Sequence, residues 1–244
     1  MNEDLSDIQY SPIRNYNYAQ LFESVNYNGK TLTDEERNQL VAIIDETISQ
    51  YSSGLPLIQE VLDSGRDKQD EYHIIDNTVA SVILFITLTM TDCLAAGKYF
   101  ILADTDYDRR FMRGKMMVIL NEGFKRLYGF DTKTQKKSEW NRLKPLMGHF
   151  PAVIQNQYEE LTHRLEGHAR SSSWWRDERN LETHLDAEKL YLSRQEEVIE
   201  SKVMMDNLKL FSSLLAVNNY LTNVHACLKN YLVEKSKRGE LIPE

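Results

Sequence analysis

An arginine and a histidine five positions apart are the residues of this chain best suited to chemistry. Arg179 and His184 stand in the stretch 170–186, which also contains Arg176 and Asn180. Histidine exchanges protons near neutral pH. Arginine keeps its charge and binds phosphate oxygens through a planar fork of N–H groups. Together these side chains suit the cleavage of a phosphodiester bond without a metal ion.

The spacing of this pair restricts how it can act. On a helix, five positions separate two side chains by roughly 140°, so Arg179 and His184 converge only where the helix bends or a second chain closes the site. Asn180 lies one turn before His184 and can orient its ring, and Arg176 lies two turns before it on the same face. Spacing alone favours a plainer interpretation, an exposed helix end whose arginines pair with Glu178 and Glu182.

Other residues near this stretch allow two interpretations each. Arg109 and Arg113 are one turn apart in a predicted helix, so they can extend a phosphate-binding surface. The alternative, on which the sequence is evenly balanced, is ion pairing within that helix. The adjacent Trp174 and Trp175 point about 100° apart on a helix. Packing in a core or a dimer interface is favoured for them over stacking on bases.

The rest of the chain offers little for other chemistries. Glu160 and His163 have the spacing of a di-iron bundle motif, but the chain has no second Glu-x-x-His to complete such a site. The histidines outside 170–186 lack ligand spacing, and the sequence shows neither a phosphate-binding loop nor a nucleophile elbow. We therefore expect no metal and no cofactor. Cys93 and Cys227 lie in apolar helical contexts, which favours a reducing compartment over a disulfide.

Helical periodicity dominates the elements that must position these residues. The chain has only 10 Gly and 5 Pro, and strand signals are nearly absent. A capping box from Thr33 to Glu36 predicts a helix that ends near 52–54, and the apolar segment 72–102 predicts a buried central helix. We also expect a basic loop at 133–137 and helices at 56–62, 107–128, 138–147, from Pro151 into the stretch 170–186, from Asp186 to Tyr191, and from a second capping box at Ser193 to about Glu234.

These elements predict an all-α fold. The expected architecture is a single bundle of four to five long helices with short connecting helices, spanning 31–244 and preceded by an irregular N-terminal arm at 1–30. Hydrophobic residues make up 41% of the 244 positions and charged residues 27%, which is an ordinary globular balance.

The overall charge and hydropathy exclude some classes of protein. A net charge of −8 argues against a protein that coats nucleic acid through bulk electrostatics, although a small basic site on an acidic body stays compatible. The first residues are acidic and lack the apolar region of a signal peptide. The most apolar run, Val79 to Met90, is too short to span a bilayer. We expect a cytoplasmic protein without membrane association.

The segment Arg179-Asn180-Leu-Glu-Thr-His184 resembles the R-[polar]-x3-H motif of HEPN domains, which are all-α domains of prokaryotic defence systems and toxins. Two segments of the preceding helix, Tyr107-Asp-Arg-Arg-Phe and Glu122-Gly-Phe-Lys-Arg-Leu-Tyr128, are similar to those of uncharacterised bacterial HEPN-like proteins. The similarity covers roughly residues 70–230.

This resemblance implies a metal-independent ribonuclease that acts as a dimer, with the arginines and histidines of both chains facing one cleft. Arg179 and His184 would be the catalytic pair and Asn180 the polar position beside the arginine. In the family the motif lies near the start of the last core helix. Here Asp186 and Ser193 predict a break just after it, and the first 65 residues have no counterpart.

Two functional hypotheses follow. In the first, a homodimeric HEPN-like protein of a defence or toxin system cleaves or binds RNA. His184 moves protons for attack of a ribose 2′-hydroxyl on the adjacent phosphate, Arg179 stabilises the charge on the phosphate oxygens, and the substrate is bound by Asn180, Arg176, Arg109 and Arg113. In the second, the protein is a non-catalytic helical module that binds a protein partner, which the acidity of the chain and the glutamates around the motif favour.

Overall fold

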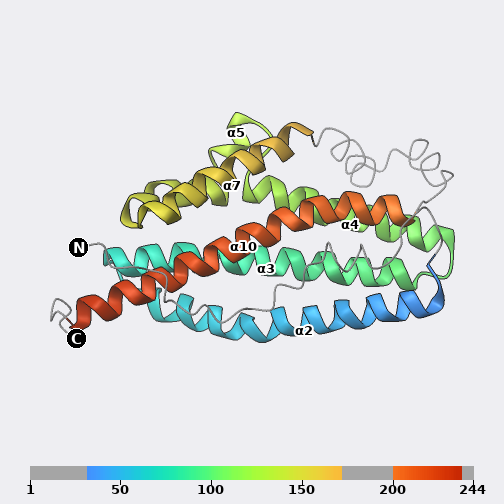
Figure 1. Ribbon diagram of the computed structural model, residues 1–244, viewed down its shortest axis with the longest axis horizontal. Helices are drawn as coiled ribbons and strands as arrows, with labels where there is room; N and C mark the ends of the chain where they lie inside the picture. The colour runs from blue at the N-terminus through green and yellow to red at the C-terminus, as the bar shows by residue number, and fades with distance from the viewer. Residues whose placement is uncertain (1–31, 172–199, 238–244) are drawn as a thin grey trace.

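The computed structural model describes residues 32–171 and 200–237, and within these ranges it confirms the all-α fold class. Figure 1 shows the long helices α2, α3 and α4 side by side, with α10 running over α3 and with α7 and the short helices at one edge. The bounds are α2 (Asp34–Gly65), α3 (Glu71–Leu102), α4 (Asp106–Leu127), α5 (Thr132–Gln135), α6 (Glu139–Leu143), the 3-10 helix η2 (Lys144–His149), α7 (Ala152–Ser171) and α10 (Glu200–Lys237).

Side-chain caps begin the first long helices. The predicted capping box is confirmed, because Glu36 N donates to Thr33 Oγ1 at 3.2 Å and Thr33 N donates to Glu36 Oε2 at 2.8 Å. Asp70 caps α3 by accepting from the backbone N–H of His73, and Thr105 caps α4 in the same way. Each cap satisfies an N–H group that has no partner inside its helix.

Helix α2 differs from the prediction. The chain was expected to break near 52–54 and to resume as a short helix at 56–62, but α2 continues through both Gly54 and Pro56 to Gly65. The contact between α2 and α3 offsets the cost of these two residues, because tertiary contacts often override helix propensity. The connection from α2 to α3 is residues 66–70.

Helix α3 is the central helix that the sequence predicted, and it contacts α2, α4 and α10. Two apolar clusters meet along it. The smaller one joins α2 to α3 and α4 through residues that include Leu40, Phe100 and Met116. The larger one joins α3 and α4 to α6, η2, α7 and α10.

Helix α3 also has the length and composition of a membrane-spanning helix, unlike the shorter run Val79 to Met90. Its most apolar 18-residue window has a mean hydropathy of 1.9, and 50% of that window is buried inside the bundle. Core helices of soluble proteins have the same properties, so this feature does not by itself indicate a membrane.

Helices α3 and α4 approach closely at a glycine. A Cβ atom at Gly123 would lie 2.4 Å from Cγ2 of Thr89, a distance that no side chain tolerates. Gly97 of α3 faces the sulfur of Met116 from α4 with ordinary contact distance. Small residues thus let the middle of α4 lie against the central helix.

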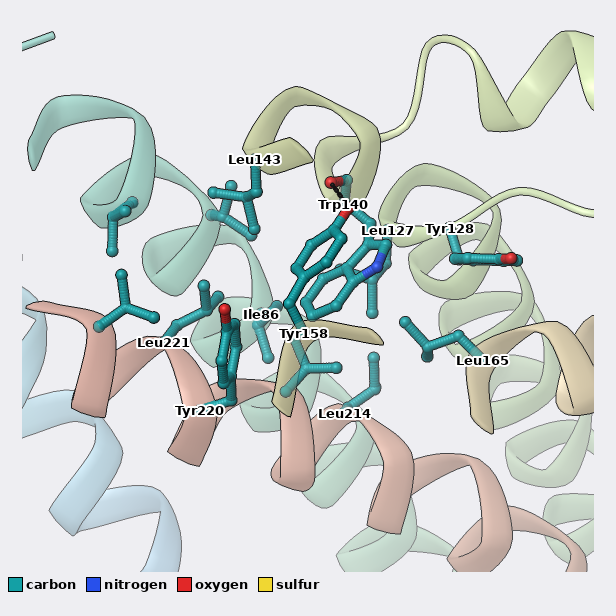
Figure 2. Packing of buried hydrophobic residues seen from close by; sticks show 14 of the residues in the cluster. Ile86, Leu127, Tyr128, Trp140, Leu143, Tyr158, Leu165, Leu214, Tyr220 and Leu221 are labelled. Atoms are coloured by element: carbon teal, nitrogen blue, oxygen red, sulfur yellow. Dashed lines mark hydrogen bonds between the residues drawn. The ribbon is translucent and has the colours of Figure 1, made fainter. Parts of the chain in front are cut away.

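An aromatic group locks the short helices onto α7 and α10. The indole of Trp140 stacks on Tyr158 with ring centroids 4.6 Å apart and an interplanar angle of 7°. Its Nε1 donates to Thr162 Oγ1 at 2.8 Å, and the Tyr158 hydroxyl donates to the Trp140 carbonyl at 3.1 Å. Figure 2 shows this stack beside Tyr220 of α10, with apolar side chains from neighbouring helices around it. Because its polar atoms are hydrogen-bonded, the aromatic group can be buried without a desolvation penalty.

Candidate nucleic-acid interface

A concentration of positive charge follows the end of α4. Residues 125–144 contain seven basic and two acidic residues, whereas the whole chain has 29 basic and 37 acidic ones. Five of these basic side chains are exposed on α5, on α6, on the turn between them and at the start of η2. We call them the basic corner: Lys133, Lys136, Lys137, Arg142 and Lys144.

One carboxylate holds two guanidinium groups beside this surface. Glu139 pairs with Arg142 at 2.5 Å and with Arg126 at 3.3 Å. Its side chain is only 10% exposed, while those of Arg142 and Arg126 are 51% and 63% exposed. The guanidinium of Arg126 also lies 4.6 Å from the centre of the Phe85 ring on α3. Two arginines therefore share one negative charge and keep exposed N–H groups for another anion.

The backbone beneath the basic corner is well defined by local hydrogen bonds. The sequence predicted a loop at 133–137, but Asp131 and Thr134 form a capping box that begins α5. Gly129 ends α4 with φ of 88°, where a Cβ atom would lie 2.6 Å from the backbone nitrogen of Gln135. The side-chain amide of Asn141 donates to the Lys136 carbonyl at 3.2 Å. The lysine backbone positions are thereby fixed in relation to α6.

Burial of α6 fixes the corner to the rest of the protein. Trp140 and Leu143 are 2% and 0% exposed, so one face of this short helix lies in the larger apolar cluster. The basic residues Arg142 and Lys144 lie on either side of Leu143 and are exposed. Because Trp140 and Leu143 occupy the buried face, Arg142 and Lys144 are left exposed to solvent.

The last turns of α7 lie close to the end of α4, next to this surface. Tyr128, at the end of α4, is close enough to Glu166 and Arg170 for their charges to act on it. Burial raises the pKa of its hydroxyl, Glu166 raises it further, and Arg170 opposes both effects. Arg170 pairs with Glu166 at 3.0 Å. The end of α7 therefore lies close to Tyr128, which precedes the basic corner in the sequence.

Four of the predicted site residues lie outside the described residues, namely Arg176, Arg179, Asn180 and His184. The same holds for Trp174 and Trp175, for the helix expected at Asp186 and for the second capping box at Ser193. Their roles stay predictions. What the structure does place is the two helices that flank them, α7 and α10.

The other two predicted residues lie at the opposite end of α4 from the basic corner. Arg109 and Arg113 are partly buried, and Arg109 pairs with Asp106 at 3.1 Å. At about 1.5 Å per residue, Arg113 and Arg126 are separated by roughly 20 Å along the helix axis. In Figure 1 the first turns of α4 lie near the start of α10, and these two helices contact each other. The two arginines therefore do not belong to the basic corner.

The histidines of the described residues make mostly pairwise contacts. His163, which shares a Glu-x-x-His spacing with Glu160, lies 3.9 Å from Glu166 instead. His225 of α10 lies 2.9 Å from Asp76 of α3, and the Tyr72 hydroxyl donates to the other Asp76 oxygen at 3.4 Å. Burial, then the Asp76 charge, raises the pKa of Tyr72 to about 12. Within residues 32–171 and 200–237, no three His, Cys, Asp or Glu side chains are grouped as metal ligands.

Sequence reasoning noticed the lysines at 133–137 but assigned them no role. It missed Arg142 and Lys144, because the turn between α5 and α6 brings them to the same corner from a separate helix. A running count of charge would have found the excess over 125–144. The chain matched no family model, no curated protein and no solved structure in the comparisons with known proteins.

Proposed function

We propose that this protein binds RNA through the basic corner and cleaves it with Arg179 and His184. The observation that carries the proposal is the basic corner itself, a fixed group of exposed cations on a chain of net charge −8. Cations held on a defined backbone suit the phosphates of a polyanion. An acidic body limits binding elsewhere on the surface, because negative charge repels the same ligand.

The placement of α7 supports the link between binding and cleavage. Arg179 follows Arg170 by nine residues, and Arg170 lies near Tyr128, which precedes the basic corner. Nine residues span at most about 30 Å of extended chain. An RNA strand held on the corner is therefore within reach of the segment that carries the proposed catalytic pair.

The proposed reaction is an internal transfer at phosphorus. His184 takes the proton of the ribose 2′-hydroxyl as its oxygen bonds to the adjacent phosphorus. The bond from phosphorus to the 5′-oxygen breaks, and that oxygen receives a proton from the imidazolium. Arg179 stabilises the negative charge that develops on the phosphate oxygens. The products are a 2′,3′-cyclic phosphate and a 5′-hydroxyl, so neither water nor a metal ion is consumed in the step.

The binding test compares two triple variants in fluorescence anisotropy with a short labelled RNA. Lys133→Gln, Lys136→Gln and Lys137→Gln together remove three cations of the corner. The control replaces three exposed lysines from elsewhere: Lys68, Lys115 and Lys229. We expect the first variant to weaken binding by at least tenfold and the control to bind like the wild type. Equal effects of both triple variants would contradict a specific RNA surface.

The cleavage test digests RNA with the wild type, R179A and H184A in the presence of EDTA. We expect only the wild type to release fragments with 2′,3′-cyclic phosphate ends, while all three proteins bind RNA. Equal cleavage by the three preparations would indicate a contaminating nuclease and would refute the catalytic roles.

A second candidate function is a non-catalytic module that binds protein. One observation favours it, the net charge of −8, which opposes an anionic ligand over most of the surface. Under this alternative no cleavage appears in the digestion test, and both triple lysine variants leave the protein's behaviour with RNA unchanged.

A further inference from the structure

One side of the central helix is apolar and open to solvent. Helices α2, α4 and α10 contact α3, but Ile74, Leu88, Tyr99 and Leu102 of α3 are 47%, 44%, 60% and 46% exposed. Large exposed apolar side chains are ordinary when they are scattered. These four fall on one face, because on a straight helix their directions lie within roughly 80° of each other. Several large exposed apolar side chains on one face of a helix make that face a candidate interaction surface.

The stripe has a regular composition. Positions seven residues apart along it are Ile74, Ser81, Leu88, Ala95 and Leu102. We call these five residues the α3 stripe. Ser81 and Ala95 are partly exposed. Seven residues come within about 20° of two full turns, which is the spacing that keeps a seam facing a partner helix.

The order of side-chain sizes is the same in both directions. Large and small residues alternate along the stripe, with Leu88 at its centre. The small residues Ser81 and Ala95 lie seven positions from Leu88, and the large residues Ile74 and Leu102 lie fourteen positions from it. A two-fold axis requires a self-complementary patch, in which residue i contacts j and j contacts i. An antiparallel copy of α3 centred on Leu88 meets this condition. Ile74 then faces Leu102 of the second copy, and Ser81 faces Ala95 of the second copy.

Charges at the margins fit the same arrangement. Asp92 is the exposed charged residue nearest the centre of the stripe. In the antiparallel register it falls opposite position 84 of the second copy. Phe85 lies next to that position and carries the guanidinium of Arg126 over its ring at 4.6 Å. The two-fold symmetry therefore brings Asp92 of each copy close to Arg126 of the other copy. On the other margin, Lys98 is neutralised by Asp45 of α2 at 2.6 Å.

The α3 stripe supplies about half of the surface that a standard interface buries on each partner. From residue 74 to residue 102 the helix extends about 42 Å, and with a width of about 10 Å it presents roughly 400 Å². A standard interface buries about 800 Å² on each partner. The exposed flanks of α2 and α4 must supply the remainder. The apolar centre and the charged margins resemble the usual division of an interface into core and rim.

From these observations we infer that the α3 stripe is the contact surface between two copies of this chain, packed antiparallel about Leu88. This inference goes beyond RNA binding and does not depend on it. The arrangement explains why the most apolar helix of the chain leaves one face uncovered by the described helices.

The first test measures the oligomeric state by sedimentation equilibrium over a range of concentrations. We expect the wild type to form a dimer. Leu88→Glu places two unpaired carboxylates at the axis and should raise the dimer dissociation constant by roughly 100-fold or more. Val153→Glu is the matched control, since Val153 is 52% exposed on α7 and should leave the dimer intact. Thermal unfolding followed by circular dichroism verifies that both variants fold.

A second test fixes the geometry by disulfide cross-linking. Leu88→Cys should form a disulfide with its own copy. A mixture of S81C and A95C should give the mixed disulfide far more readily than either variant gives its own, with the wild-type cysteines Cys93 and Cys227 as the background control. In a charge exchange, D92R should weaken the dimer and the double variant D92R/R126D should restore it.

Three outcomes would overturn the inference. A wild type that is monomeric at every concentration would show that the stripe is covered by other residues of the same chain or by a different partner. A dimer unaffected by Leu88→Glu would place the contact elsewhere. Self-disulfides of S81C and of A95C in preference to the mixed one would exclude the antiparallel register.

Discussion

The side chain of Asp70 is the N-cap of α3, the most apolar of the described helices. It accepts a hydrogen bond from His73 N at 3.1 Å and lies 2.5 Å from His73 Nδ1. The backbone hydrogen bond is the main cause of the lowered pKa of this carboxyl group, and the contact with the His73 ring adds to it. Since α3 contacts three other long helices, a single cap contributes to the order of the whole bundle.

Because the pKa of Asp70 is lowered in the folded state, the free energy of unfolding depends on pH, and the direction of this dependence follows from the shift. A carboxyl whose pKa is lower in the folded state stabilises the fold fully above its unfolded pKa of about 3.9, and this contribution is lost as the pH falls through the lower folded pKa. We expect Asp70→Ala to cost about 1 kcal/mol at neutral pH, and this cost should shrink in acid. Asp70→Asn keeps the cap without the charge, so it should stay near the wild type. Urea unfolding from pH 7 downward measures both, and a constant difference in acid would contradict this role.

At the scale of elements, close packing of α3 on α4 makes one glycine indispensable and leaves another replaceable. Gly123 faces Thr89 at a distance that excludes a Cβ atom, whereas a Cβ atom at Gly54 of α2 would meet nothing within 4 Å. Both glycines lie inside helices, where alanine is favoured by about 1 kcal/mol. Replacing each glycine by alanine therefore tests two different effects: helix propensity alone at Gly54, and propensity opposed by close packing at Gly123.

We expect Gly54→Ala to raise the free energy of unfolding by up to about 1 kcal/mol. Gly123→Ala should lower it, because overpacking costs roughly 1–3 kcal/mol and outweighs the same propensity gain. Thr89→Ser removes Cγ2 and keeps the hydroxyl that donates to the Phe85 carbonyl at 2.9 Å. The double variant Gly123→Ala/Thr89→Ser should therefore recover much of the free energy of unfolding that Gly123→Ala loses. Thermal and urea unfolding of the four proteins measure this, and a stabilised Gly123→Ala variant would refute the close approach.

The elements also show where sequence reasoning succeeds and where it fails. The segment 72–102 could be predicted because its apolar residues, length and lack of turn signals all indicate a buried helix. The break at 52–54 was wrong because Gly54 and Pro56 are local signals, while the contact of α2 with α3 is not local. The loop expected at 133–137 was wrong for residues 133–135, which belong to α5, and the reason is the opposite one. Its helix depends on a four-residue capping box from Asp131 to Thr134, which looks like a turn in the sequence.

At the scale of the whole molecule, a net charge of −8 and a local excess of positive charge act in opposite directions on an RNA ligand. Each phosphate of single-stranded RNA neutralised by the protein lowers the logarithmic slope of affinity against salt by about 0.7. Five cations in the basic corner give a limiting slope of about −3.5. Sequence totals predicted this compatibility of a basic site with an acidic body, but only the fold shows which cations gather.

We expect the triple variant of Lys133, Lys136 and Lys137 to have a slope shallower by about 2 than the wild type. Anisotropy titrations across a series of potassium chloride concentrations measure it. The control with Lys68, Lys115 and Lys229 replaced should retain the wild-type slope. Equal slopes for wild type and corner variant would mean that RNA contacts other cations.

The continuous helix α2 has a further consequence. Pro56 lacks an amide hydrogen, so the ladder of hydrogen bonds is interrupted at the Ser52 carbonyl. The buried side chains Leu40, Ile44 and Thr47 all precede this gap, and only Gly65 is buried after it. The last ten residues of α2 can therefore open as a local unit, at a lower free energy than unfolding of the bundle. We therefore expect hydrogen exchange to distinguish two classes of amide protons in α2, slower before Ser52 and faster after Pro56.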